Sequence, residues 1–476
     1  MASKHHVFCI PFPGAGHGVN MMNIALALAS PTVTVHTLVH SIKQSGSWIA
    51  ATGQAPNQYM HLEVIGDGKW EDWHPPGARE LVQTIMSDEY TASNEAKVAE
   101  ILTRSADSRG VALIFNGLMG KLLGVAERYS MKTFLLNPTA YYMGRLGSCH
   151  REGASLTEKY ALRGIGGSTK PVQAELGDVL DLTQQMYYMM FKPTLDAVSG
   201  VIYSQTNTGL DGDDYQQKTL IAPNNLNKAE YMVGPLLPPW FEEALENRSG
   251  TAEKLAAASQ DYECMRFMDA QPEKSVVYVG TGSHIELEFE QAKAIIDALR
   301  KHHVPWVLLF RNDTDKMRSL LGGDSITDGV VAPWVPQLEM LLHPALKCVF
   351  SHGGFGTMVE GIYAGQSFIT TPVMSDQFID TRVMLHLGIA LGTIAENRHV
   401  SGMGREKLTP FWPADSDKIL AELFDSIFDG SEEAEKRLQN ARNASLALRK
   451  RMKDAKARTG AAELQRLRRD MVMVGS

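Results

Sequence analysis

Short apolar runs alternate with helix-like segments along the first half of the chain. The runs are rich in β-branched and aromatic residues and occupy 7–12, 32–39, 61–65, 111–116 and 132–137. Between them lie segments with helical patterns, such as 21–29 and 122–129. Strands and helices that alternate at this spacing are typical of a parallel sheet with helices on both faces. The first half is therefore predicted to be an α/β domain.

A stretch rich in Pro, Gly and charged residues interrupts this rhythm at 234–250. Strand-like runs then resume at 275–283, 305–310, 330–334, 348–354 and 367–372. We therefore predict two Rossmann-like domains, at 1–235 and 256–455, with a linker at 236–255. Because open α/β sheets bind ligands at the carboxyl ends of their strands, we expect the two domains to face each other across a cleft that holds the site. The charged segment 456–476 is expected to be a helix that packs back across the domain seam.

The composition of the chain limits the classes of partner and the cellular compartment that we expect. A formal net charge of −8 at pH 7 argues against nucleic acid or an anionic membrane surface as the main partner. The four cysteines are far apart and form no CxxC pair, which indicates free thiols in a reducing compartment. The apolar run at the N-terminus is too short for a signal peptide, and no run is long enough to span a membrane. We therefore expect a cytoplasmic protein.

Polar and aromatic residues gather after the later strands, in the stretch 334–377. Trp334 follows a short strand, and an indole face can stack on a flat nucleobase ring. Ser-His-Gly-Gly at 351–354 ends a strand, and Gly-Thr-Met-Val-Glu at 356–360 begins a helix. Glycines at a helix N-terminus form an anion site that suits a diphosphate. The combination indicates a nucleotide-sugar site, and hence glycosyl transfer.

This stretch resembles the donor signature of the UDP-dependent glycosyltransferases that act on small lipophilic acceptors, those of plants and some fungi and bacteria. That signature opens with Trp-x-Pro-Gln and closes with Asp-Gln, as at 334–337 and 376–377 here. The resemblance extends to the lead-in 269–283 and to Gly-Pro-Leu at 234–236, whereas in the N-terminal half it is confined to short matches. It implies the GT-B fold, which consists of two facing Rossmann-like domains, and a UDP-sugar as donor.

The resemblance also implies which residues hold the nucleotide. Gln337 and Glu360 are expected to bind the ribose, because an amide or a carboxylate can accept hydrogen bonds from vicinal hydroxyls. His352 and Thr357 would donate to the diphosphate, together with Ser283 from the loop after the strand 275–283. The leaving UDP would then be stabilised by a helix N-terminus and an imidazole.

The sugar end of the signature is implied in the same way. Asp376 and Gln377 look like the residues that contact sugar hydroxyls, and Gln at the closing position is similar to the glucose users of the family. Two departures are present, because the plant pattern has Trp-Asn where this chain has Phe355-Gly356, and often Asn where it has Asp380. The loss of that Asn leaves its contact to backbone N–H groups or water. The complete implied donor set is Ser283, Trp334, Val335, Gln337, His352, Gly354, Phe355, Gly356, Thr357, Glu360, Asp376 and Gln377.

A histidine lies where the resemblance implies the catalytic base. Inverting glycosyl transfer needs a base that deprotonates the acceptor as it attacks the anomeric carbon. His17 follows the first strand and lies on a glycine-rich turn at the mouth of the first helix. A helix N-terminus disfavours the imidazolium, so the ring should be neutral and able to accept a proton near pH 7. We predict that His17 is the general base rather than a residue that only caps the helix.

The expected partner of this histidine is changed in the sequence. In most relatives an Asp at the end of a later strand orients the His and stabilises its cation, and the matching residue here is Asn116. An amide carbonyl can still accept the imidazole N–H, but it cannot offset the positive charge. In a protease triad such a change costs about four orders of magnitude in turnover, although an acidic phenol needs less help. Three hypotheses remain: a His-only transferase for acidic acceptors, an enzyme that recruits another carboxylate, and a chain that has lost its activity.

Acceptor and metal sites are less clearly marked. Aromatic and Met-rich segments at 69–76, 140–144 and 184–191 could form an adaptable apolar wall, although the last could equally be helical core. The candidate acceptor residues are Trp73, Tyr141, Met186 and Tyr187. Asp-Gly-Asp at 211–213 resembles the metal motif of other glycosyltransferases, but a helix cap in a polar turn explains it better. We therefore expect no metal and no other cofactor.

The predicted activity is transfer of a sugar, most simply glucose, from a UDP-sugar to a hydroxyl of a small aromatic or otherwise lipophilic acceptor, with inversion. Alternatives are C-glycosylation of phenols and a catalytically weakened UDP-sugar binder. A non-hydrolysing sugar-nucleotide epimerase shares the architecture, but such enzymes lack the Trp-to-Gln signature. We expect a monomer.

Overall fold

The computed structural model describes residues 5–13, 15–52, 57–66, 78–104, 109–137, 159–162, 165–175, 192–211, 228–282, 285–373, 376–394, 410 and 412–473. The chain divides into two compact units. Unit 1 comprises Met1–Ala154, Leu182–Pro239 and Met452–Ser476, and unit 2 comprises Ser155–Asp181 and Trp240–Arg451. The two predicted α/β domains are thus present. Segment 155–181 of the first half, however, groups with unit 2, and segment 452–476 of the second half groups with unit 1.

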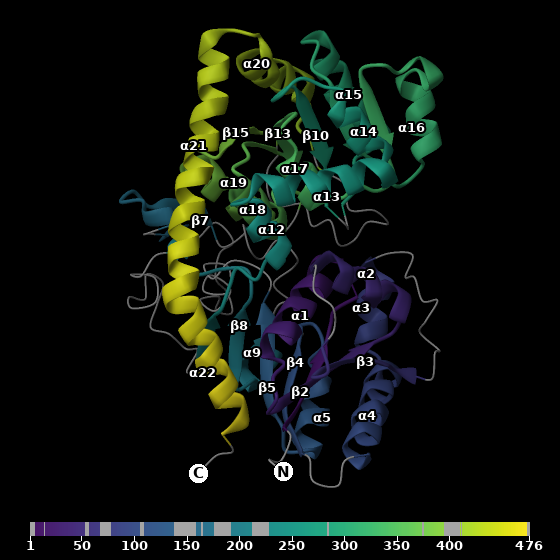
Figure 1. The fold of residues 1–476 in the computed structure, drawn as a ribbon, viewed down its shortest axis with the longest axis vertical. Coiled ribbons are helices and arrows are strands. Elements are labelled where there is room, and N and C mark those ends of the chain that lie inside the picture. The colour runs from purple at the N-terminus through teal and green to yellow at the C-terminus, as the bar shows by residue number, and fades with distance from the viewer. Residues whose placement is uncertain are drawn as a thin grey trace. The chain divides into compact units, whose positions relative to one another are not determined.

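Unit 1 contains a parallel sheet of seven strands in the order β3-β2-β1-β4-β5-β8-β9 (Figure 1). Their bounds are β1 His5–Ile10, β2 Val33–Val39, β3 Met60–Val64, β4 Arg109–Phe115, β5 Lys132–Asn137, β8 Gly200–Tyr203 and β9 Ala229–Met232. The five strands predicted from the apolar runs are all present. β8 and β9 were not predicted, because each has only four residues.

Helices cover both faces of this sheet. They are α1 Ala15–Leu28, α2 Ile42–Thr52, α3 Ala78–Ile85, α4 Asp88–Thr103, α5 Leu122–Arg128, α9 Lys192–Ala197, α10 Thr208–Asp211 and α22 Ala461–Val472. Successive side chains of a strand point to opposite faces. Val7 and Cys9 of β1 therefore share one face, where they form a core with residues of α1 and with Leu467 and Met471 of α22.

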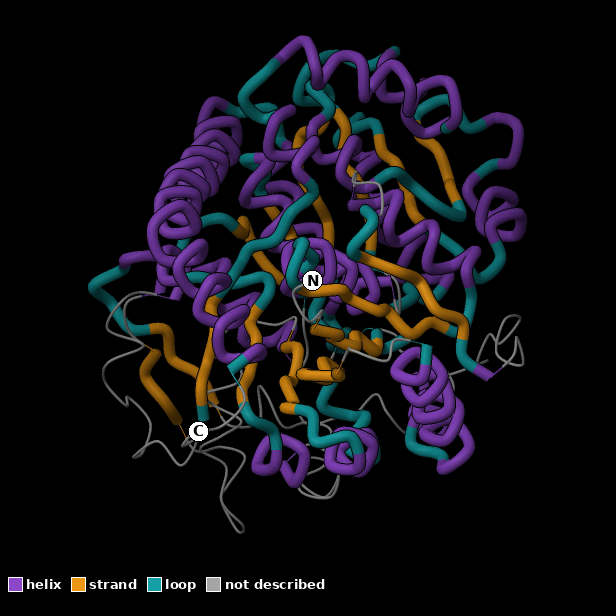
Figure 2. The backbone as a smooth tube through the Cα atoms, turned by 60° about the horizontal axis from the view of Figure 1, so that its bottom comes forward, coloured by secondary structure: helices purple, strands orange, loops and turns teal. Residues whose placement is uncertain are grey.

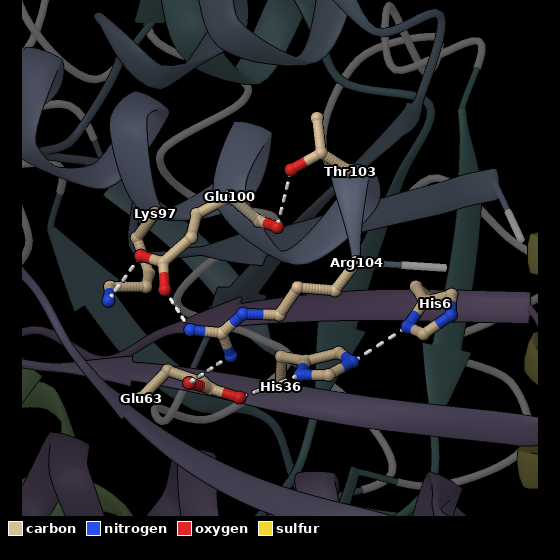
Figure 3. Close-up of polar contacts among 7 residues, drawn as sticks. All are labelled: His6, His36, Glu63, Lys97, Glu100, Thr103 and Arg104. Carbon is tan, nitrogen blue, oxygen red and sulfur yellow. Dashed lines mark hydrogen bonds and ion pairs between the residues drawn. The ribbon is translucent and has the colours of Figure 1, made fainter. Parts of the chain in front are cut away.

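The other face of the unit 1 sheet carries a row of polar side chains (Figure 3). Nδ1 of His6 on β1 lies 2.6 Å from Nε2 of His36 on β2, and Nδ1 of His36 lies 3.3 Å from Oε1 of Glu63 on β3. Arg104, just after α4, pairs with Glu63 at 3.9 Å and also with Glu100. The hydrogen bond from His36 and the charge of Arg104 hold the pKa of Glu63 below its usual value.

Unit 2 contains a parallel sheet of six strands in the order β12-β11-β10-β13-β14-β15. Their bounds are β10 Val276–Gly280, β11 Trp306–Leu309, β12 Gly329–Ala332, β13 Leu346–Ser351, β14 Phe368–Thr370 and β15 Ala390–Thr393. Figure 2 shows the strands of each sheet side by side, in orange. The five strand-like runs of the second half coincide with β10 to β14.

The helices of unit 2 are α12 Pro239–Ala244, α13 Arg248–Asp261, α14 Glu263–Asp269, α15 Phe289–Lys301, α16 Thr314–Leu321, α17 Gln337–Leu342, α18 Phe355–Ala364, α19 Asp376–His386, α20 Ser416–Phe428 and α21 Glu432–Ala455. The antiparallel hairpin β6 Lys159–Leu162 and β7 Val172–Glu175 also belongs to unit 2. It is fixed to α19 by Arg382, which donates to the carbonyl of Gln173 at 3.0 Å. The segment predicted as a linker, 236–255, is helical over much of its length.

Candidate active site

His17 and Asn116 lie against each other in unit 1. We had predicted that His17 lies on the turn before the first helix. Helix α1 begins at Ala15, however, so His17 lies inside its first turn. Asn116 directly follows β4. The order of the strands reverses between β1 and β4, and residues that follow the two strands meet at such a point. Nδ2 of Asn116 is accordingly 3.2 Å from Nδ1 of His17.

A backbone group sets the orientation of the Asn116 side chain. The N–H of Leu118 donates to Oδ1 of Asn116 at 3.1 Å. Because a backbone N–H can only donate, the amide oxygen must face Leu118, and the amide NH2 group then faces His17. The prediction that the carbonyl accepts the imidazole N–H is therefore wrong. The amide instead donates to the ring.

Trp334 presents a large apolar surface in unit 2. It follows β12 and is 55% exposed. Its ring packs on Tyr262, the residue before α14, with 4.8 Å between the ring centroids and 42° between the planes. An indole that is supported by a tyrosine and still half exposed can accept a planar ring, as predicted for uracil. Val335, the next residue, is buried in the core, so its part can be only that of its backbone or of packing.

The two residues predicted to bind the ribose are neighbours. Nε2 of Gln337, at the start of α17, donates to Oε2 of Glu360 on α18 at 2.6 Å. The hydroxyl of Tyr278 on β10 donates to Oε1 of Gln337 at 3.4 Å. Burial raises the pKa of Glu360 to about 7, and the hydrogen bond from Gln337 opposes that shift. The result is a chain of hydrogen bonds that ends on a carboxyl group poised to titrate near neutral pH.

His352 is seated between two glycines at the point where the strand order of unit 2 reverses. Gly282 follows β10, and His352 follows β13, its neighbour in the sheet. A Cβ at Gly282 would lie 2.6 Å from Cε1 of His352, and a Cβ at Gly354 would lie 2.3 Å from Nε2. Both distances are shorter than van der Waals contact, so only glycine at these two positions leaves room for the ring. Gly353, between His352 and Gly354, has φ +75°, and a Cβ there would lie 2.6 Å from Oγ1 of Thr381 on α19.

The N-terminus of α18 has the composition predicted for an anion site. Gly354 is its N-cap residue and has no side chain to satisfy the first backbone N–H groups. Phe355 and Thr357 are buried, whereas a Cβ at Gly356 would meet nothing within 4 Å. The position at which the plant pattern has Asn is therefore open enough to accept a larger side chain.

Asp376 and Gln377 begin α19. Oε1 of Gln377 accepts a hydrogen bond from the N–H of Val373 at 2.9 Å, so its amide NH2 group is the end that can donate to a ligand. Burial raises the pKa of Asp376 to about 6. One turn further along the helix, Asp380 is fully buried.

Several predicted residues lie outside the described residues. They are Ser283 of the donor set and the four acceptor candidates, Trp73, Tyr141, Met186 and Tyr187. Of the Asp-Gly-Asp motif, only Asp211 is described. Its side chain is buried and accepts a hydrogen bond from the hydroxyl of Thr206. Among the described residues no cluster of three His, Cys, Asp or Glu side chains could hold a metal. In the same part of the chain, no helix is both long and apolar enough to cross a membrane.

Sequence reasoning missed three residues of the site. Tyr278 looked like an ordinary core residue of a strand, and Tyr262 like a residue of a charged helical segment. Leu118 contributes only its backbone N–H, which carries no sequence signal. The His–Asn pair and the donor residues each had a motif, whereas these three become visible only through their contacts.

The chain is similar to known glycosyltransferases in sequence and in fold. Residues 244–403 match the family model described as "UDP-glucoronosyl and UDP-glucosyl transferase". The chain is 23% identical to UDP-glycosyltransferase 84B1 of Arabidopsis thaliana over 83% of its own length and 85% of the relative's. It is 25% identical to anthocyanidin 3-O-glucosyltransferase 1 of Fragaria ananassa over 80% and 83% of the two chains.

Solved structures share the whole fold. A UDP-glucosyltransferase from Polygonum tinctorium that glucosylates indoxyl, in complex with 3,4-dichloroaniline, aligns with a TM-score of 0.71 at 17% identity, over 100% of both chains. A UGT transferase from Siraitia grosvenorii in complex with UDP aligns with a TM-score of 0.68 at 16% identity, over 99% of this chain and 100% of the other. These likenesses establish the predicted fold, with its two parallel-sheet α/β domains.

Proposed function

Because the chain belongs to the family of plant-type UDP-glycosyltransferases, we propose that it transfers glucose from UDP-glucose to an oxygen of a small aromatic or otherwise lipophilic acceptor, with inversion at the anomeric carbon. That it is a glycosyltransferase enzyme follows from the family. The sugar, the stereochemistry, the acceptor and the roles of individual residues are the proposal.

The observation that carries the proposal is the chemistry of the segment that runs from Trp334 to the end of α18. An exposed indole, Trp334, would stack on uracil, and the linked pair Gln337 and Glu360 would bind the ribose hydroxyls. His352 and the backbone N–H groups at the start of α18 would bind the diphosphate. Together these groups would supply the contacts that a UDP moiety requires.

The sugar would be recognised by the first residues of α19. The NH2 group of Gln377 is turned away from its own backbone contact and would donate to a glucose hydroxyl, while Asp376 would accept from another. Charge on the leaving UDP would be balanced by His352 and by the helix N-terminus rather than by a metal ion. We propose a metal-independent reaction in a cytoplasmic monomer, and full activity in the presence of a chelator tests the first of these points.

In unit 1, His17 is the group proposed to contact the acceptor oxygen. It lies in the first turn of α1 with its ring held by Asn116 and against Phe12, at 4.9 Å between ring centroids. Nucleophilic attack by the acceptor would displace UDP from the opposite side of the anomeric carbon, which inverts its configuration.

A second candidate function is suggested by Asn116, which replaces the usual carboxylate: a UDP-sugar binder with little transferase activity. One incubation separates the two. The purified protein is mixed with UDP-glucose and other UDP-sugars and with a panel of phenols, carboxylic acids and alcohols, and the products are read by mass spectrometry. Glycoside formation with stoichiometric UDP release supports the transferase, and UDP-sugar binding without any glycoside would leave only the binder. The same spectra, with acid hydrolysis, distinguish O-glycosides from C-glycosides.

A further inference from the structure

The Asn116 amide determines which nitrogen of His17 carries the proton. We infer that His17 acts as a hydrogen-bond donor toward an acceptor that is already ionised, an inference that rests on the proposed transferase function. The enzyme would therefore select carboxylates and acidic phenols over neutral alcohols. This reverses the role that the histidine would have as a general base.

The first step is the direction of one hydrogen bond. Oδ1 of Asn116 is committed to the N–H of Leu118 at 3.1 Å, so Nδ2 is the atom that faces Nδ1 of His17 at 3.2 Å. An amide NH2 group has no lone pair to offer and can only donate. Nδ1 of His17 must therefore be the acceptor of this bond. In a neutral imidazole whose Nδ1 accepts, the proton resides on Nε2.

The second step concerns the charged form of the ring. An imidazolium would carry a hydrogen on Nδ1, which would then face the N–H of Asn116 across 3.2 Å, donor against donor. The start of α1, where His17 lies, also disfavours a positive charge. Both effects oppose uptake of a proton by His17. An aspartate at 116 would behave differently, since its two oxygens could accept from Leu118 and from a protonated His17 together.

The third step concerns the glycosyl transfer reaction itself. With its proton on Nε2, the ring has no lone pair there to take a proton from an acceptor hydroxyl, but its N–H can donate to an oxyanion. One oxygen of a carboxylate or phenolate then forms the new bond to the anomeric carbon as the bond from that carbon to the UDP oxygen breaks. The electron pair leaves with UDP, which departs with one more negative charge than it had in the UDP-sugar. No proton is transferred in this step, because the acceptor lost its proton to the solvent beforehand.

The kinetic test uses acceptors of graded acidity. For the wild-type enzyme, we expect kcat/KM of each phenol to rise about tenfold per pH unit below the pKa of that phenol and then to level off. At saturating UDP-glucose, carboxylic acids should be used at a rate that does not change between pH 6 and pH 8, and aliphatic alcohols should be poor acceptors. Equal kcat/KM for alcohols and phenols of similar size, independent of ionisation, would overturn the inference.

Two substitutions provide matched variants. Asn116→Asp retains an acceptor for the Leu118 N–H and should raise kcat/KM on alcohols by about a hundredfold relative to that on carboxylic acids. His17→Gln keeps an N–H donor but cannot act as a base, so its kcat/KM on carboxylates should exceed that of His17→Ala, which has no donor, by about tenfold or more. Equal loss in His17→Gln and His17→Ala, or an unchanged acceptor preference in Asn116→Asp, would contradict the inference.

The tautomer can also be measured without turnover. In protein labelled with 15N-histidine, the His17 resonances are assigned by their absence in His17→Gln. The wild type should show Nε2–H and an unprotonated Nδ1 at pH 7, and Asn116→Asp should show a proton on Nδ1. A proton on Nδ1 of the wild type refutes the inference whatever the activity. If instead no acceptor of any class is glycosylated while the Nε2–H tautomer is observed, the proposed function fails and the structural inference stands.

Discussion

Nε2 of Gln337 donates a hydrogen bond to Oε2 of Glu360 at 2.6 Å, so the two residues predicted to bind a ribose are already joined to each other. Glu360 is at the same time the carboxyl group of the donor site whose pKa burial raises to about 7. The proposed binding of ribose would therefore be coupled to the ionisation of this residue.

The first prediction concerns pH and UDP affinity. An ionised Glu360 accepts from ribose hydroxyls better than a neutral one, so UDP affinity should increase as pH rises through about 7. The phosphate of UDP titrates near pH 6 as well, but it contributes equally to a Glu360→Gln variant. Calorimetric titrations of both proteins between pH 5.5 and pH 8.5 check this. The prediction fails if the ratio of the two affinities is the same at every pH.

The Glu360→Gln substitution should weaken UDP binding at high pH but should stabilise the fold there. A carboxyl group whose pKa is raised on folding contributes most below its unfolded value and loses that contribution as pH rises through the folded value. Glu360→Gln should therefore raise the midpoint of thermal unfolding at pH 8 relative to the wild type, with little change at pH 4.5. The difference corresponds to at most about 3 kcal/mol. A variant that is less stable at pH 8 would show that the carboxylate is stabilised by groups other than Gln337.

The second prediction uses two neighbouring glycines of α18. A Cβ at Gly354 would lie 2.3 Å from Nε2 of His352, whereas a Cβ at Gly356 would meet nothing within 4 Å. Gly354→Ala should therefore displace His352 and weaken UDP binding by about tenfold or more. Gly356→Ala, the matched control, should bind UDP as the wild type does and unfold at a slightly higher temperature, since alanine favours a helix. Equal loss of affinity in both variants would show that His352 is not the affected group.

The third prediction tests the support of Trp334. Tyr262 packs on the indole at 4.8 Å, so Tyr262→Ala should let the indole move and should weaken UDP binding several-fold. Tyr262→Phe keeps the ring and should leave the affinity unchanged. If the phenylalanine variant is impaired as much as the alanine variant, the hydroxyl and not the ring contact matters.

The fourth prediction concerns the polar row of unit 1 (Figure 3). The pKa of Glu63 is lowered, first by the hydrogen bond from His36, so its contribution to stability is present above its unfolded pKa and lost as pH falls through the folded value. Glu63→Gln should lower the unfolding temperature by a few degrees at pH 7 and by less at pH 3. Glu80→Gln, at an exposed position on α3, serves as control. A loss that is equal at both pH values would assign the effect to packing.

The sequence predicted those parts of the molecule that depend on neighbours along the chain. The apolar runs that became β1 to β5 and β10 to β14 are long or β-branched, and the proposed donor residues other than Ser283 lie in one continuous motif. β15 was missed because Ala-Leu-Gly-Thr offers no strand signal. The segment 155–181 could not be assigned to unit 2 from its sequence, because it is joined to α19 only through contacts such as that of Arg382 with Gln173.

The types of residue in the candidate site could be predicted from the sequence, but the orientation of their side chains could not. His17 and Asn116 were both identified, yet the direction of the bond between them depends on the backbone N–H of Leu118. The position of the His352 ring likewise depends on Gly282. This glycine is far from His352 in sequence and lies near it only because β10 and β13 are adjacent.

Calorimetric titration of the purified protein with UDP tests the central claim most directly. We predict saturable binding of one UDP per chain. Trp334→Ala should weaken it by roughly tenfold to a hundredfold, as the loss of one base–aromatic stack does, and His352→Ala should weaken it further. Absence of UDP binding, or an affinity that both substitutions leave unchanged, would contradict the assignment of this site.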